Sequence, residues 1–264
     1  MGRKNYSSDL TDKEWEEIKI YFPDTLRADK RGRPREHSKR ELLNGIFYVV
    51  RSGCSWRMLP HDFPDWTIVY HYFRMWKKDG TLKKLNDALR EEMRGKANRN
   101  REPSVGIIDS QSVKTVDISG DRGYDSAKKV NGRKRHIVVD ILGLILAVEV
   151  HKGNIQDRDG AKIVLSKIIG MYPRLKLIWA DHGYSGQLVD WVKVTCNWIL
   201  DIVKRPAGMK GFKVLPHRWV VERTFGWLNK YRRLSKDYEC LTDTSEAMIY
   251  TAMIRLMVKR LAKT

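Results

Sequence analysis

The sequence predicts an α/β protein in which a mixed sheet flanked by helices follows an N-terminal all-α domain. Residues 1–95 carry apolar residues at helical spacing. After the polar, basic segment 96–103, three short apolar runs precede alternating helix and strand patterns. Adjacent strands followed by such an alternation are typical of a mixed sheet covered by helices. We therefore predict a helical domain at 1–95, a linker at 96–103 and an α/β domain at 104–264.

Two capping-box patterns, at 11–14 and 38–41, mark helix starts in the N-terminal part. In this motif a hydroxyl and a carboxylate each satisfy a backbone amide that the first helical turn leaves unbonded. Further helices are expected at 66–78 and 81–94. Short helices before an aromatic, basic helix favour a helix-turn-helix DNA-binding domain with 66–78 as its reader. The alternative is a helical bundle that only makes subunit contacts.

The C-terminal part changes from helical spacing to apolar runs of strand length. Leu142 and Gly143 separate two of these runs and predict a hairpin turn. In chain order we expect strands at 104–109, 134–141 and 144–150, a helix at 157–169, a strand at 175–180, a helix around 184–194, a strand at 198–204, and helices at about 217–230 and 244–262.

The composition favours a polyanionic partner. The chain has 51 Lys and Arg against 32 Asp and Glu, a formal net charge of +19. DNA suits this charge better than a membrane, because the most apolar stretch, 137–150, is interrupted by polar residues and is too short to span a bilayer. The chain begins without a signal-peptide pattern, and Cys54, Cys196 and Cys240 lie far apart. We expect a cytoplasmic, nucleoid-associated protein with reduced, buried thiols.

Three acids lie in positions that suggest metal binding. Asp109 and Asp181 each end an apolar run. Glu222 lies in a helical pattern and is the only acid between Lys204 and Lys236, a stretch with ten Lys or Arg. Mg²⁺ prefers oxygen ligands, and two such ions can activate the attacking oxygen and stabilise the leaving oxygen of a phosphodiester. The three acids therefore suggest an enzyme that cuts or joins nucleic acid.

Each acid also has a simpler explanation. Asp109 and Asp181 could each cap a turn. Glu222 lies four residues after Arg218, the spacing of a helical ion pair worth only a few tenths of a kcal/mol. Such a pair does not explain why so basic a segment retains a single acid.

Several segments, in order along the chain, resemble one family. Residues 218–239 look like the C-terminal acidic signature of the IS5 family of insertion-sequence transposases. Residues 106–114 and 179–184 resemble that family's first and second acid motifs. Residues 128–136 and 53–60, the latter with the helix that follows it, are similar too. The resemblance covers nearly the whole chain, and linked motifs in order are far more specific than any single acid.

The resemblance implies a DNA transposase with an RNase H-like (retroviral integrase-type) catalytic core. Asp109, Asp181 and Glu222 would be its catalytic, metal-binding residues and would hold two Mg²⁺ or Mn²⁺ ions. The protein would bind the terminal inverted repeats, cut there and join the freed end to target DNA, as a homodimer on DNA. Related families pair the glutamate with a Tyr, an Arg and a Lys. Arg218 fits that Arg, whereas Leu215 and Asn229 depart from the other two positions, so the resemblance does not imply a hairpin route that rests on the tyrosine.

Basic residues in four segments are candidate DNA contacts. Those in the linker-like 31–35 segment, on the 66–78 helix, in the hairpin 128–135 and around Glu222 share an open alternative, a solvated charged surface. Asp157 and Asp159 fit caps of the helix that follows, with Asp157 a candidate support for the active site. The candidate DNA contacts are Arg31, Arg33, Arg35, Arg74, Lys77, Lys128, Lys129, Arg133, Lys134, Arg135, Arg218, Arg223, Lys230, Arg232 and Arg233.

Four aromatic or imidazole side chains complete the candidates. His136 and His182 could touch phosphate or move a proton, with ordinary polar packing as the preferred interpretation. Trp227 and Tyr231 fit the core better than a base-stacking platform. Two rival functions remain beside transposition: an RNase H-like nuclease that cuts without joining, and a non-catalytic DNA-binding protein derived from a transposase. The presence of all three acids disfavours the second rival.

Overall fold

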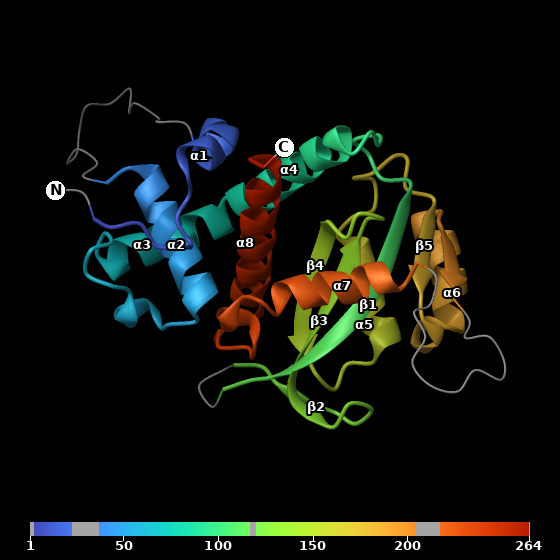
Figure 1. The fold of residues 1–264 in the computed structure, drawn as a ribbon. Coiled ribbons are helices and arrows are strands. Elements are labelled where there is room, and N and C mark those ends of the chain that lie inside the picture. Colours follow the sequence, from blue (N-terminus) through green and yellow to red (C-terminus); the bar gives the residue numbers. More distant parts are fainter. Residues whose placement is uncertain (1–2, 23–36, 117–119, 204–216, 264) are drawn as a thin grey trace.

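The computed structural model describes residues 3–22, 37–116, 120–203 and 217–263. The N-terminal helices lie on one side, the sheet lies on the other, and the long helix α8 stands between them (Figure 1). The described α-helices are α1 (Asp12–Ile18), α2 (Lys39–Ser52), α3 (Trp66–Lys78), α4 (Thr81–Lys96), α5 (Asp157–Ser166), α6 (Gln187–Trp191), α7 (Trp219–Leu228) and α8 (Thr242–Leu261).

The helices begin where local signals place them. The capping box at Thr11 is complete, because Thr11 accepts a bond from the amide of Glu14, whose carboxylate bonds back to the amide of Thr11. Only half of the second box forms: Ser38 accepts from the amide of Glu41, but that carboxylate binds the side chain of Arg3. The helix expected at 184–194 is broken into a 3₁₀ turn, α6 and a π turn (Val192–Cys196). Other short 3₁₀ turns are η1 (Lys19–Tyr21), η2 (Trp56–Met58) and η5 (Arg232–Leu234).

The sheet is mixed. β3 is central: β1 pairs with one edge of it, and β4 and the short β2 share the other, all antiparallel. β5 adds to β1 and β6 adds to β5, both parallel. Two features were not expected: β1 continues five residues beyond Asp109, and β2 exists. The strands are β1 (Val105–Lys114), β2 (Gly123–Asp125), β3 (Val130–Val139), β4 (Ile145–Lys152), β5 (Leu177–Ala180) and β6 (Ile199–Ile202).

The sheet separates two hydrophobic clusters. Because successive side chains of a strand point to opposite faces, Ile107 packs with the α7 and α8 side while Ile108 packs with the α5 and α6 side. The same alternation fixes the directions of the polar residues that follow in β1. Asp109 must face the α7 side, and Ser110 must face α5.

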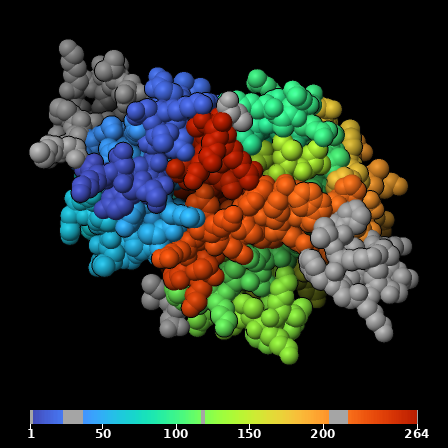
Figure 2. All heavy atoms as spheres, viewed as in Figure 1, coloured from blue at the N-terminus to red at the C-terminus, as the bar shows by residue number. Residues whose placement is uncertain are grey.

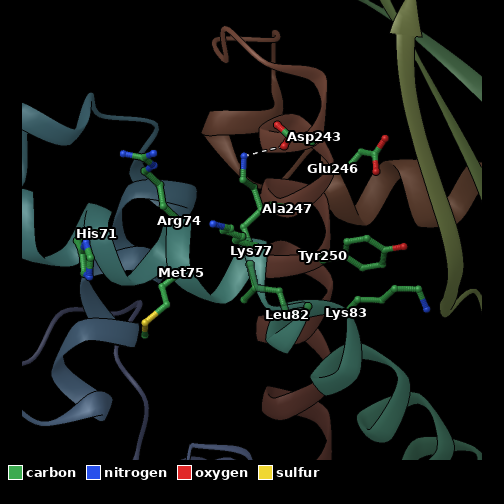
Figure 3. Close-up of a pocket in the computed structure, with 12 residues that line it drawn as sticks. His71, Arg74, Met75, Lys77, Leu82, Lys83, Asp243, Glu246, Ala247 and Tyr250 are labelled. Carbon is green, nitrogen blue, oxygen red and sulfur yellow. Dashed lines mark hydrogen bonds and ion pairs between the residues drawn. The ribbon is translucent and has the colours of Figure 1, made fainter.

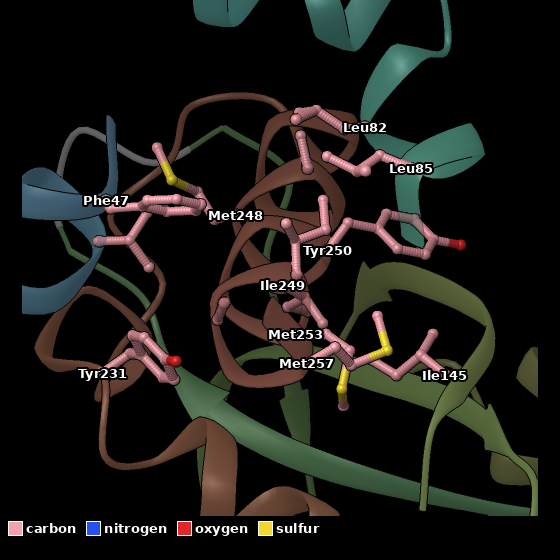
Figure 4. Packing of buried hydrophobic residues seen from close by; sticks show 14 of the residues in the cluster. Phe47, Leu82, Leu85, Ile145, Tyr231, Met248, Ile249, Tyr250, Met253 and Met257 are labelled. Atoms are coloured by element: carbon pink, nitrogen blue, oxygen red, sulfur yellow. The ribbon is translucent and has the colours of Figure 1, made fainter. Parts of the chain in front are cut away.

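Helix α8 joins the helical part to the sheet. Its 20 residues are apolar on most sides, and its buried residues contact α2, α4 and β4 in one cluster (Figure 4). Phe47 of α2, Leu85 of α4 and Ile145 of β4 all belong to that cluster. The core therefore runs without a break past the expected linker at 96–103, and the division into two domains stays a prediction.

Two smaller expectations can be compared with the structure. No helix within the described ranges is long and apolar enough to cross a membrane. All three cysteines are free, but only Cys196 is buried. Cys54 is half-buried and Cys240 is exposed, so the expectation of three buried thiols was wrong.

Candidate active site

The register of two parallel strands brings the first two acids together. Ile107 of β1 lies opposite Trp179 of β5. Asp109 and Asp181 each come two residues later, so they follow at the same level of neighbouring chains. Asp181 directly follows β5, and Asp109 lies in β1 just beyond the last residue paired with β5. Helix α7 packs against β1 on the face to which Asp109 points.

The guanidinium of Arg218 lies among all three predicted acids. Its Nη2 is 3.5 Å from Oδ2 of Asp109 and 3.4 Å from Oδ2 of Asp181. The same nitrogen is 3.8 Å from Oε1 of Glu222, one turn along α7. We call Asp109, Asp181 and Glu222 the carboxylate cluster. Its members are separated by 72 and 41 positions along the chain, so the fold assembles the set that the sequence singled out.

The simpler explanations for the acids hold beside this arrangement. The carboxylate of Asp109 accepts the backbone N–H of Ser110 at 2.7 Å, and that of Asp181 accepts the N–H of Gly183 at 2.8 Å. These bonds fix both carboxylates and leave one oxygen of each facing Arg218. The ion pair between Glu222 and Arg218 is long, and the Glu222 side chain is 46% exposed. It adds little stability by itself.

Burial makes Asp109 a costly anion. The side chain is 16% exposed. Burial, with the nearby charge of Asp181, raises the pKa of Asp109 to about 6, although the Ser110 amide and the charges of Arg218 and Lys128 act in the opposite direction. A bound cation favours the charged form of a carboxylate. A cation bound at this site would therefore offset the unfavourable burial of the charged Asp109 carboxylate.

The three carboxylates suit a hard divalent cation, but in this structure the guanidinium of Arg218 lies among them. All three groups are carboxylates, the ligands that Mg²⁺ and Mn²⁺ prefer. Among the described residues, no three acidic, His or Cys side chains stand in an arrangement that could hold a metal ion. The Arg218 guanidinium occupies the space among the three acids. For the cluster to bind metal, this side chain must move.

A second polar layer supports β1 from the α5 side. Ser110 donates to Asp157 at 3.0 Å, and the ammonium of Lys134 lies 3.1 Å from the same carboxylate. Gln156, not Asp157, is the N-cap of α5, so the expected cap is not formed by that side chain. Asp159 is exposed and lies near Lys162. Asp157 thus contacts the residue next to Asp109, which agrees with the candidate support role.

The two histidines differ. His136 is buried, and its Nδ1 lies 2.7 Å from Nε2 of His151. Burial and the neighbouring His151 lower its pKa to about 3, so this ring stays neutral. His182 is exposed in the turn after Asp181. Polar packing therefore accounts for His136.

Four of the predicted DNA contacts are buried and bonded inside the protein, which corrects the expectation for them. Arg133 pairs with Asp237, and Arg135 donates to the carbonyls of Leu234 and Lys236. Lys134 faces Asp157 on the other side of β3. Arg233 donates to Glu239. The side chains of Arg133, Lys134, Arg135 and Arg233 are therefore internal counter-charges rather than a surface for a ligand.

The other candidates have mixed positions. Arg74 is exposed on α3, beside a cavity of about 910 Å³ between α3, α4 and α8 (Figure 3). Lys77 lines the same cavity but is bonded to Asp243 at 2.9 Å. Arg223 is half-buried beside two indole rings. Lys128, Lys129, Lys230 and Arg232 are exposed, whereas Arg31, Arg33, Arg35 and Leu215 lie outside the described residues.

Comparison with sequence families decides the identity of the chain. Residues 100–257, more than half of its length, match the family described as "Transposase DDE domain". The chain belongs to the DDE transposase family. Residues 10–86 match a second family, described as "Putative transposase of IS4/5 family". The expected insertion-sequence transposase and its RNase H-like α/β fold are thereby confirmed.

Two curated relatives match parts of this DDE transposase. A "Putative transposase for insertion sequence element IS402" from Burkholderia cepacia is 28% identical over 125 residues, which cover 45% of this chain and 59% of the relative. An "Uncharacterized protein y4sN" from Sinorhizobium fredii is 32% identical over 83 residues, 31% of this chain and 64% of the relative. The matches thus span less than two thirds of either relative. A crystal structure of the Mos1 mariner paired end complex with Mn is similar over 96% of this chain and 86% of that chain, with 12% identity and a TM-score of 0.30.

The sequence patterns missed several residues of the site. Ser110 was known only as the neighbour of Asp109, and its bond to Asp157 depends on the strand continuing past Asp109. For Arg218, the sequence predicted a pair with Glu222 but not the contacts with Asp109 and Asp181. Trp219 is 41% exposed beside Arg218. Its helical spacing to Arg223 and Trp227 was the one signal that could have marked it.

Proposed function

We propose that this DDE transposase binds the ends of an insertion sequence, cuts a DNA strand there and joins the freed end to target DNA. The carboxylate cluster carries the proposal, because Asp109, Asp181 and Glu222 all lie within 4 Å of one nitrogen of Arg218. Three acids that meet at a single point beside exposed basic residues suit phosphodiester chemistry.

Asp109, Asp181 and Glu222 would hold two Mg²⁺ or Mn²⁺ ions. When bound, such ions activate the attacking oxygen and stabilise the leaving oxygen of a phosphodiester. The chain holds Asp109 and Asp181 in place through backbone amides, whereas Glu222 stands more exposed on α7. Once displaced from the acids, Arg218 can bind a phosphate oxygen through its guanidinium.

The DNA partner follows from the family and the charge. Exposed Lys128, Lys129, Lys230 and Arg232 can neutralise backbone phosphates. Arg74 and Lys77 remain the proposed contacts of the helix-turn-helix-like part, although Lys77 would first have to leave Asp243. Two element ends must be brought together before joining, so we propose a homodimer on DNA.

An assay with labelled end DNA and a target plasmid tests the proposed function. With Mg²⁺ we expect both a nicked end and a product covalently joined to the plasmid. Asp109→Asn, Asp181→Asn and Glu222→Gln should each abolish both products, while the exposed Asp159→Asn control keeps them. Cleavage without joining would favour the nuclease rival. Unchanged cleavage by the three variants would exclude the carboxylate cluster as the catalytic centre.

A further inference from the structure

A second pocket, which we call the basic seam, lies where the N-terminal residues meet the ends of α2, α7 and α8. It has a volume of about 370 Å³. Figure 2 shows the blue N-terminal residues beside the red α8 and the orange α7 on one face of the molecule. No Asp or Glu occurs among the described residues that line it. Its cationic lining residues are Arg51, Lys230, Arg255, Lys259, Arg260 and Lys263.

Most of these charges lack a counter-charge from the protein. Arg255 is neutralised by Glu14 at 2.9 Å. Within the described ranges, none of the other five cations makes an ion pair with a carboxylate. Gathering like charges in one concavity costs free energy that a bound anion would recover. The cavity beside α3 differs, because Asp243 and Glu246 line it and Lys77 is paired with Asp243.

The walls of the basic seam are built to hold an anion. Arg51 donates to the carbonyl of Lys230 at 2.6 Å, which ties α2 to the end of α7. The hydroxyl of Ser8 is buried at the seam and has no hydrogen-bond partner among the described residues. The guanidinium of Arg260 stacks on the indole of Trp227, 4.0 Å from the ring centre. These contacts fix donors in place before a ligand arrives.

A row of aromatic and cationic side chains on α7 leads from the basic seam toward the end of the helix that carries Glu222. The guanidinium of Arg223 lies 4.5 Å from the ring of Trp219 and 4.6 Å from that of Trp227. Arg260 covers Trp227 in turn, which gives an alternating stack of indoles and guanidiniums. Trp227 comes five residues after Glu222, or about 8 Å along a helix axis. A DNA strand advances about 3.4 Å per nucleotide, so the seam and the cluster are a few nucleotides apart.

We propose that the basic seam binds backbone phosphates of the DNA strand that is cut at the carboxylate cluster. The inference rests on the proposed function and extends it, because it assigns a path for the strand along α7. It also gives the joint between the helical part and the sheet a role in DNA binding. The recognised group is a phosphate, which either DNA or free inorganic phosphate could supply.

The test compares two double variants with equal change in charge. Lys259→Gln with Lys263→Gln neutralises two exposed cations of the seam. Lys176→Gln with Lys193→Gln neutralises two exposed cations near β5 and α6 and serves as the control. Affinity for a short labelled duplex of arbitrary sequence is measured by anisotropy across a salt series, since phosphate contacts do not depend on sequence. Each lost phosphate contact should reduce the slope of log affinity against log salt by about 0.9.

We expect the slope of log affinity against log salt to fall in the seam variant by the amount of about two phosphate contacts. The control should keep the slope of the parent protein. Equal slopes for both variants would overturn the proposal. Calorimetric binding of inorganic phosphate that the seam variant loses, with an unchanged DNA slope, would also overturn it in favour of a free anion. If the double variant does not fold, Lys230→Gln replaces it with an expected loss of about one contact. Strand cleavage by the parent protein is measured separately, so a failure of the proposed function is distinguished from a failure of the seam.

Discussion

At the scale of single residues, Asp109 combines rigidity with an unfavourable charge. β1 and the Ser110 amide fix its carboxylate, while burial and Asp181 raise its pKa to about 6. The charged form of such a group is stabilised by a bound cation. When no cation is bound, the charged carboxylate lowers the stability of the folded protein. Among the described residues, Arg218 is the only arginine that forms ion pairs with the three acids, with its Nη2 at 3.4 to 3.8 Å from their carboxylate oxygens.

Replacing Asp109 with Asn should make stability less dependent on pH. The pKa of Asp109 is about 6 in the folded protein against an ordinary 3.8, so its contribution to stability is complete below about pH 4 and is lost as the pH rises through 6. Without divalent metal, the free energy of unfolding of Asp109→Asn should therefore rise relative to that of the parent protein between pH 4 and 7, by up to about 3 kcal/mol. Urea unfolding in a chelating buffer measures the difference at each pH. A difference that stays constant with pH would contradict the cause assigned to the shift.

Replacing Arg218 should separate metal binding from catalysis. Its guanidinium competes for the carboxylates that we propose as metal ligands, so Arg218→Gln should bind Mn²⁺ about tenfold more tightly without DNA. The same variant should cut DNA more slowly, because it lacks the group proposed to bind phosphate. Arg218→Lys keeps the charge and is the control for affinity. Titration by electron paramagnetic resonance measures the Mn²⁺ affinity, and an affinity no tighter than that of the parent protein would refute the competition.

At the scale of elements, β3 shows where sequence patterns fail. The run Arg133, Lys134 and Arg135 was predicted as a charged surface because cations cluster there along the chain. In the sheet, β3 is central and all three side chains are buried. The partner of Arg133, Asp237, lies about a hundred residues further on, so no local pattern could reveal the pair. Alternation was still visible: Lys134 faces the α5 side while its two neighbours face the segment before α8.

The local features were predictable for the opposite reason. Helix starts depend on caps within four residues, and α3 begins and ends as expected. The acids were marked by the ends of apolar runs, which need only the strand pattern. β2 has three residues and pairs through β3 alone, so it left no periodic signal. The contacts of Arg218 with Asp109 and Asp181 depend on the strand register. Helical spacing along the sequence could predict only its pair with Glu222.

Substitution of Arg133 should act on stability rather than on DNA binding. It donates to the carbonyls of Glu239 and Cys240 and pairs with Asp237, and both charged side chains are fully buried. Arg133→Met leaves an unpaired buried carboxylate, which costs about 3–5 kcal/mol. Exposed Lys129→Met is the control and should change stability by less than about 0.5 kcal/mol. Urea unfolding gives both values. Unchanged stability with weakened DNA binding would restore the original surface interpretation.

At the scale of the whole molecule, α8 makes the helical part and the sheet share one core. Its residues pack against α2 and α4 on one side and against β4 on another. The basic seam lies on the same joint, between α2, α7 and the last turns of α8. A ligand there would therefore contact both parts of the protein at once. The two family matches, 10–86 and 100–257, describe sequence units that this core connects.

The shared core predicts that both parts unfold together. Met253 of α8 is fully buried within the cluster, and Met253→Ala should cost about 2–5 kcal/mol through the cavity that it leaves. Because α8 contacts both parts, the loss should lower the protection of α2 and of β3 by the same amount. Hydrogen exchange measured by mass spectrometry across a urea series reports both elements in one experiment. Ile163→Ala, on the exposed side of α5, is the control and should change neither by more than about 0.5 kcal/mol. Loss of protection in α2 alone would show that the helical part is a separate folding unit and that α8 does not couple it to the sheet.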